Sequence, residues 1–237
     1  MNNALEVAGL VLLCLLLLST FAIFSAFFPA KREGHAFVRQ MAYDAVIIAL
    51  LIIMTFVPNM GFIFVTPFIS FTLLHIPVLV GACLFGAKRG AIYGLVFGLC
   101  SYLQALLQGS GFNLLFAVPW TAIPPRVLFG FFAGLAFSFI RKVSKSRAKG
   151  LYLGLASCGL TLFHTLLVFL TLYIFYPNEV TGFLSSTSPV AQGTALTFLA
   201  CIGLGALGEM ALAGAITPSL CLAISKATGG RKESAAR

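Results

Sequence analysis

Long apolar runs separated by short polar connectors dominate the chain. Residues 7–28 contain no charged side chain, and at about 1.5 Å per helical residue such a run crosses a bilayer once. We interpret it as a retained helix and not a signal peptide, because the charged residue before it is Glu6 and no cation precedes it. Six further runs follow, at residues 40–57, 72–85, 91–107, 125–140, 150–176 and 205–226. The pattern predicts an all-α polytopic membrane protein with seven spans.

Proline and glycine mark breaks where no charge does. Pro58, Gly61 and Pro67 divide the long uncharged stretch, so residues 61–71 are predicted to form a hydrophobic loop between two helices. Residues 190–204 are also apolar, and the sequence leaves open whether they form a half-span or a helix on the outer surface. A helical bundle with an apolar outer loop is typical of a binding protein embedded in the membrane.

The composition excludes most soluble classes of protein. Hydrophobic residues make up 60% of the chain and charged residues 9%, and the mean hydropathy is +1.04. A soluble domain carries about 25% charged residues, so a soluble enzyme, a nucleic-acid-binding protein and a disordered chain are all excluded. The six cysteines lie singly in apolar runs without a Cys-x-x-Cys pair, which argues against a disulfide framework or a metal site.

The positions of the cations behind the net charge of +9 indicate the membrane topology. Every Lys and Arg except Arg126 falls in one of four connectors, which follow the first, third, fifth and seventh predicted spans: Lys31, Arg32, Arg39; Lys88, Arg89; Arg141, Lys142, Lys145, Arg147, Lys149; Lys226, Arg231, Lys232, Arg237. Alternate connectors share one side of the membrane, and cations mark the cytoplasmic side. We therefore expect the N-terminus outside and the C-terminus in the cytoplasm.

Arg126 is the exceptional cation, at the outer start of the fifth span. A charge inside a membrane is costly, so it usually faces a cavity or a partner. A guanidinium group suits bidentate binding of a carboxylate or a phosphate. The alternative is an interfacial arginine that reaches out to lipid headgroups.

Other polar residues are candidates for the same site. Glu209 lies near the outer start of the last span, and His75 and His164 lie inside other spans. Each of the three either pairs with Arg126, lines a cavity or satisfies a backbone group. Trp120, in the connector before Arg126, is either a ligand contact or an interfacial anchor. Asn113 adds an amide to this outer half.

Small residues at four-residue spacing indicate close helix packing. Ala45 and Ala49 lie one helical turn apart on the second span, and such a pair lets another helix approach closely. The alternatives are a partner-binding face and ordinary packing. The same spacing recurs at Gly90, Gly94 and Gly98 and at Gly130 and Gly134, where internal packing is the favoured interpretation.

No catalytic pattern accompanies these residues. Gly109-Ser110-Gly111 lacks the strand–turn context of a hydrolase nucleophile, and neither a GxxxxGK[ST] loop nor a metal-ligand spacing is present in the sequence. We therefore expect a protein that is not an enzyme and carries no metal or cofactor of its own. Any step driven by ATP would then be performed by another chain.

Three blocks of sequence carry a family resemblance. Residues 74–90 read LHIPVLVGACLFGAKRG, residues 125–130 read PRVLFG, and residues 208–218 read GEMALAGAITP. Over about residues 41–227, these blocks and the Ala45/Ala49 pair resemble the substrate-binding (S) components of energy-coupling factor (ECF) vitamin transporters. The similarity is greatest to the pantothenate-type branch, whose fifth helix tends to carry Asn-Thr where this chain has His164-Thr165.

The resemblance implies a six-helix substrate-binding domain at residues 40–228. An extra transmembrane helix and basic connector would precede it at residues 1–39, and a basic cytoplasmic tail would follow at residues 229–237. It also implies a vitamin bound near the outer face, under the loop between the first two core helices. The partners would be a coupling transmembrane subunit, which Ala45 and Ala49 would contact, and two ATPase subunits that use ATP.

The resemblance further implies import across a bacterial plasma membrane by reorientation of the loaded protein. Arg126, Glu209, Asn113 and His164 would bind the carboxylate and hydroxyl groups of pantothenate, with Trp120 and His75 nearby. Folate, riboflavin and cobalamin are alternative substrates. A stand-alone proton-coupled transporter, with Glu209 or His164 as its proton site, is the alternative from another class, and uptake without ATPase subunits would distinguish it.

Overall fold

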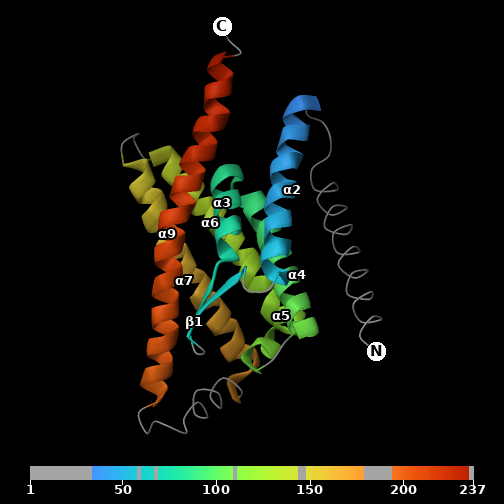
Figure 1. Ribbon diagram of the computed structural model, residues 1–237, viewed down its shortest axis with the longest axis vertical. Coiled ribbons are helices and arrows are strands. Elements are labelled where there is room, and N and C mark those ends of the chain that lie inside the picture. The colour runs from blue at the N-terminus through green and yellow to red at the C-terminus, as the bar shows by residue number, and fades with distance from the viewer. Residues whose placement is uncertain are drawn as a thin grey trace. The chain divides into compact units, whose positions relative to one another are not determined.

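The computed structural model describes residues 34–57, 60–66, 69–108, 111–143, 148–178 and 194–234, and most of them are helical (Figure 1). The elements are α2 (Gly34–Phe56), α3 (His75–Phe85), α4 (Ala87–Gln108), the 3-10 helix η1 (Gly111–Phe116), α5 (Pro119–Ala122), α6 (Pro124–Val143), α7 (Lys149–Phe175) and α9 (Thr194–Ser234). The predicted all-α class is confirmed. The predicted span at residues 7–28 lies outside the described residues, as do residues 179–193.

Five described helices are long and apolar enough to cross a membrane: Val38–Phe56, Ala87–Leu107, Pro119–Lys142, Lys149–Phe175 and Gly205–Ala227. A sixth apolar helix, α3, is shorter. These helices match the six spans predicted for the core. The described part of the 190–204 segment belongs to α9, which runs without interruption from Thr194, so it is neither a separate half-span nor a separate surface helix.

A β-hairpin stands where the sequence predicted a hydrophobic loop. Strands β1 (Phe62–Thr66) and β2 (Ile69–Thr72) pair antiparallel, with Phe62 opposite Thr72. The N–H of Leu73 donates to the carbonyl oxygen of Gly61 at 2.8 Å and extends the pairing toward α3. Aromatic and β-branched residues favour strands, but this run is apolar at nearly every position and lacks the alternation that reveals a half-buried strand.

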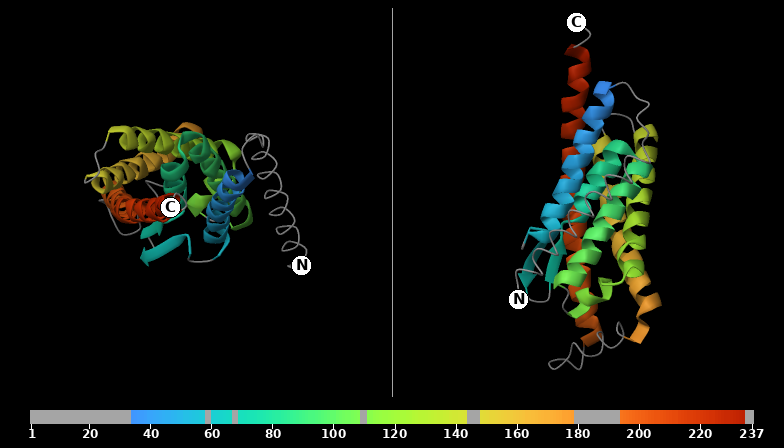
Figure 2. Two further views of the ribbon diagram at one scale, coloured as in Figure 1. Left: turned by 90° about the horizontal axis from the view of Figure 1, so that it is seen from above. Right: turned by 90° about the vertical axis from the view of Figure 1, so that its right-hand side faces the viewer.

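Helix α3 is the core of the larger compact unit, Ile47–Arg237, which begins inside α2 and contains the candidate site. It contacts α4, α6 and α9, and all its residues from His75 to Cys83 are buried. A helix that is apolar on every side suits such a position. Around it, α4 packs on α6, and α7 lies along α9 (Figure 2).

Helices α4 and α6 meet backbone to backbone. A side-chain carbon added to Gly90 would collide with the carbonyl oxygen of Gly130, and one added to Gly94 would collide with the carbonyl oxygen of Arg126. Glycines at this spacing allow two helices to approach this closely, as their sequence pattern indicated. The contact sets the position of Arg126, near the start of α6, relative to α4.

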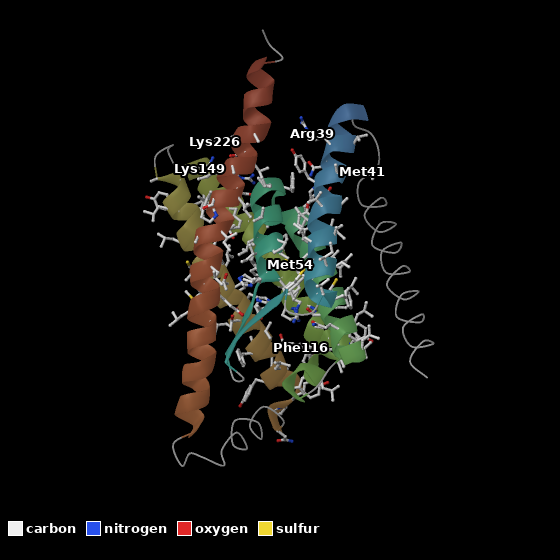
Figure 3. The ribbon with its side chains drawn as sticks, viewed as in Figure 1. Arg39, Met41, Met54, Phe116, Lys149 and Lys226 are labelled. Atoms are coloured by element: carbon white, nitrogen blue, oxygen red, sulfur yellow. The ribbon has the colours of Figure 1, made fainter. Side chains whose placement is uncertain are left out.

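The two ends of this unit differ in chemistry. Lys149 and Lys226 lie toward one end, and Phe116 lies toward the other (Figure 3). This placement agrees with the sorting of cations into connectors on one side. Which end faces the cytoplasm stays a prediction of the charge pattern.

Candidate functional site

Arg126 is buried near the start of α6, two residues after the helix begins at Pro124. Its Nη1 donates a hydrogen bond to the carbonyl oxygen of Ala122 at 2.7 Å, whereas its Nε has no hydrogen-bond partner. In the part of the chain that the structure describes, no carboxylate forms an ion pair with this guanidinium. The interpretation of Arg126 as a snorkelling surface residue does not fit a side chain that is 6% exposed.

Two aromatic rings hold the guanidinium group. Its Cζ lies 5.0 Å from the ring centroid of Phe97 in α4 and 4.9 Å from that of Phe116 in η1. Such cation–π contacts orient the planar group and stabilise part of its charge. Because no described carboxylate neutralises the charge, the arrangement is suited to an anionic ligand.

Two buried histidines continue the cluster, because His164 contacts Phe97 and His75 stacks on His164. The ring of His164, in α7, is 4.7 Å from the Phe129 centroid and 5.6 Å from the Phe97 centroid. The ring of His75, the first residue of α3, stacks on His164 at 6.4 Å. Nε2 of His164 has no hydrogen-bond partner in the described structure. Neither ring nitrogen of His75 makes a hydrogen bond of standard geometry there, although the backbones of Thr72 and Glu209 approach its ring. Buried polar atoms are rarely left unpaired, so these nitrogens are candidate ligand contacts.

Glu209 satisfies a backbone group, which is one of the three roles considered for it in the sequence. Its Oε1 accepts a hydrogen bond from the backbone N–H of Thr72 at 2.6 Å, which joins α9 to the end of β2. Thr72 lies three residues before His75, so the carboxylate binds the segment that leads into the buried cluster. No contact between Glu209 and Arg126 is seen among the described side chains.

The structure does not bring every predicted residue together. Trp120, in α5, is 67% exposed, whereas its neighbours Thr121 and Ala122 are buried. An exposed tryptophan fits the interfacial anchor considered above. Asn113 falls in η1, but its side chain lies outside what the structure describes. Ligand roles for both residues stay predictions.

The sequence reading missed the aromatic residues that organise the site. Phe129 lies three residues after Arg126 on α6, a spacing that places both on one helix face and was available from the sequence. Phe97 and Phe116 come from other elements, and no local signal marks them among 24 phenylalanines. Thr72 was missed because it acts through its backbone N–H.

The groups of the cluster can bind an anionic ligand. The cluster combines a buried cation, two imidazoles and aromatic walls, and no nucleophile lies among the side chains that contact one another there. No group of three or more His, Cys, Asp or Glu residues that could hold a metal ion occurs in the described part of the chain. Ala45 and Ala49 are both exposed on α2, and their role in partner binding stays a prediction.

Comparison with known proteins matches the chain to one family. Residues 39–221 match the family model described as "ECF transporter, substrate-specific component". The "Pantothenic acid transporter PanT" of Lactococcus lactis subsp. cremoris is 28% identical over 207 residues, which cover 80% of this chain and 97% of that protein. The "Pantothenate transporter PanT" of Leuconostoc mesenteroides subsp. mesenteroides is 35% identical over 94 residues, which cover 38% of this chain and 46% of that protein.

Proposed function

Because this chain belongs to the family of substrate-specific components of ECF transporters, we propose that it binds pantothenate for an ATP-driven importer. Family membership and the apolar helices make it a multi-pass membrane protein. Two similar proteins named as pantothenate transporters support this substrate. The substrate itself would supply the negative charge that the buried site lacks.

The observation that carries the proposal is the buried guanidinium of Arg126, which has no carboxylate partner among the described residues. Pantothenate carries one carboxylate, one amide and two hydroxyl groups. Arg126 would bind the carboxylate, which a guanidinium fork fits in a bidentate way. The unpaired nitrogens of His164 and His75 would bind hydroxyl or amide groups. The rings of Phe97 and Phe129 would cover the apolar gem-dimethyl carbon.

The proposal extends to the partners and the orientation. A coupling transmembrane subunit would bind the face of α2 that exposes Ala45 and Ala49. ATP would be used by two ATPase subunits and not by this chain. The N-terminus would lie outside the bacterial plasma membrane and the C-terminus in the cytoplasm, because cations favour the cytoplasmic side.

Binding of vitamins to the purified protein tests the substrate and the role of Arg126 together. The wild type is titrated with pantothenate, riboflavin, folate and cobalamin in detergent by isothermal titration calorimetry, and we expect it to bind pantothenate alone. Removing one partner of a buried charge pair costs about 2–5 kcal/mol. We therefore expect Arg126→Ala to weaken pantothenate binding at least about 30-fold, and Arg126→Lys to have a smaller effect because it keeps the charge without the fork.

Arg141→Ala is the matched control, because Arg141 belongs to the same helix but is exposed at its other end. Its Nη1 donates to the carbonyl oxygen of Leu84 at 3.2 Å, away from the site. We expect pantothenate affinity to stay at the wild-type level. Binding of another vitamin in place of pantothenate would reject the substrate assignment, and equal affinities of Arg126→Ala and wild type would reject the carboxylate role.

A further inference from the structure

We infer that Glu209 is a positioning residue, which fixes the end of the β-hairpin to α9 and thereby holds His75 in the buried cluster. This role differs from the direct ligand contact that the family resemblance implied. The inference rests on the proposed function only in the second of its two tests, which measures pantothenate dissociation. It concerns a single carboxylate whose contact the structure describes.

The contact itself is short and charge-assisted. Oε1 of Glu209 accepts from the N–H of Thr72 at 2.6 Å, and the Thr72 side chain approaches the same carboxylate. Hydrogen bonds to a charged group are shorter and about twice as strong as neutral ones. Further contacts between β2 and α9 surround this pair, and the hairpin lies beside α9 (Figure 1).

The hairpin geometry explains why Thr72 needs this partner. Thr72 stands at the end of β2 opposite Phe62, and its N–H points toward α9 and not toward β1. The next residue, Leu73, turns back and donates to Gly61 within the hairpin. A two-stranded sheet leaves outward donors unpaired at its edges, and in a membrane such a donor is expensive. The carboxylate of Glu209 accepts the hydrogen bond that the carbonyl oxygen of a third strand would accept in a wider sheet.

The same contact determines where α3 begins. Only Leu73 and Leu74 separate Thr72 from His75, and Leu74 is 1% exposed. No side-chain hydrogen bond caps the start of α3. The first turn of α3 is therefore positioned by the preceding segment, which Glu209 fixes at Thr72. Because His75 is the first residue of α3, the position of this turn determines how His75 stacks on His164.

Charge also argues against a direct ligand role for Glu209. The site that contains Arg126 is suited to an anion, and a second carboxylate facing the ligand would repel it. One oxygen of Glu209 is already bound to Thr72, and no described contact joins the carboxylate to Arg126. Glu209 would thus act on the ligand through the hairpin and His75.

Hydrogen–deuterium exchange of the ligand-free protein tests the contact without any assumption about the substrate. Glu209→Leu removes the acceptor, Glu209→Gln keeps an oxygen acceptor, Thr72→Pro removes the donor, and Thr72→Val is its control that keeps the N–H. Loss of a hydrogen bond to a charged group corresponds to a change of about 10- to 100-fold. We expect Glu209→Leu and Thr72→Pro to speed exchange at Leu73 and Ile76 by this factor.

Glu209→Gln should speed exchange only about threefold to tenfold, because the N–H···O contact persists without its charge assistance. Thr72→Val keeps the N–H but loses the hydroxyl that approaches the carboxylate, so its exchange should lie between those of the wild type and Thr72→Pro. Proline is tolerable at position 72 because its N–H faces out of the ladder. Unchanged exchange at Leu73 in Glu209→Leu would overturn the inference. So would an increase of equal size in α4 and α6, because it would mean general destabilisation.

The rate of pantothenate dissociation supplies the second readout. We expect about 10- to 100-fold faster dissociation in Glu209→Leu and in Thr72→Pro, and a smaller increase of about threefold to tenfold in Glu209→Gln. The double variant Thr72→Pro/Glu209→Leu should be no faster than either single variant, because both break one contact. Multiplying effects, or normal dissociation in Thr72→Pro, would identify Glu209 as a direct ligand. If the wild type binds no pantothenate, the proposed function fails and exchange alone decides the inference.

Discussion

At the scale of residues, the site gathers hydrogen-bonding nitrogens that have no partner in the described structure. Nε of Arg126, Nε2 of His164 and the ring nitrogens of His75 are all buried, and each unpaired group costs free energy. Cation–π contacts with Phe97 and Phe116 offset part of this cost for the arginine. A ligand rich in oxygen acceptors would satisfy several groups at once. Substitutions there should therefore change affinity more than stability.

His164→Phe separates these two effects. Phenylalanine keeps the ring contacts with Phe97 and Phe129 and removes the unpaired Nε2. A hydrogen bond is worth about 0.5–1.5 kcal/mol, so we expect pantothenate affinity to fall about threefold to tenfold. The thermal midpoint in detergent should not fall, because no buried polar atom is left unpaired. Thr165→Val is the control, since the Thr165 hydroxyl donates to the carbonyl oxygen of Thr161 at 3.2 Å; equal affinities of His164→Phe and wild type would exclude the ligand contact.

At the scale of elements, the close approach of α4 and α6 holds the site together. Arg126 belongs to α6 and Phe97 to α4, so the geometry of their contact depends on how these helices pack. Gly90, Gly94 and Gly130 allow the two backbones to touch. In lipid, helix association depends on such close packing because water no longer drives it. The glycines do not line the site, but they set the distance between the helices that carry Phe97 and Arg126.

Gly130→Ala tests this packing against Gly159→Ala. A methyl group at position 130 would collide with the carbonyl oxygen of Gly90, whereas one at position 159 would meet nothing within 4 Å. Overpacking costs about 1–3 kcal/mol, so we expect Gly130→Ala to lower the thermal midpoint and weaken pantothenate binding. Gly159→Ala should be neutral or stabilising, because alanine is the better helix former. Equal midpoints for the two variants would refute the close contact.

At the scale of the whole molecule, large apolar side chains are exposed along the described helices, whereas Arg126, His75 and His164 are buried. Large apolar residues such as Phe139, Leu151 and Leu155 are more than half exposed on their helices, as lipid-facing positions require. Ala45 and Ala49 interrupt this bulk on α2 with two small exposed side chains. A partner helix can approach closely at such a place. Ligand binding and partner binding would thus use separate parts of the chain.

Ala45→Leu/Ala49→Leu should separate these two activities. The added side chains would keep a partner helix away, so we expect the variant to bind pantothenate normally and to fail to co-purify with the coupling and ATPase subunits. Gly159→Leu adds one leucine side chain at another exposed position and should leave assembly intact. Normal co-purification of the double variant would mean that this face is ordinary surface.

A comparison of predicted and observed contacts, residue by residue, shows which features can be recognised from local sequence. Arg126 was identified because a lone charge in an apolar run is visible in the sequence, and the structure places it in a buried cluster. Glu209 was equally visible, yet its partner Thr72 lies 137 residues away in the chain. The hairpin was missed because its apolar run has no alternation. Phe97 and Phe116 become special only through the helices that bring them to Arg126.

The sequence alone determined the membrane class, the positions of the core spans, the sorting of cations and the choice of Arg126. Hydropathy and charge act locally against the bilayer, so these features need no knowledge of packing. Only the tertiary structure decided that His75 and His164 stack, that aromatic rings enclose Arg126, and that Glu209 holds the end of a hairpin. Those contacts join segments that are distant in the sequence. The geometry of the Arg126–Phe97 contact depends in addition on how close the glycines let α4 and α6 approach.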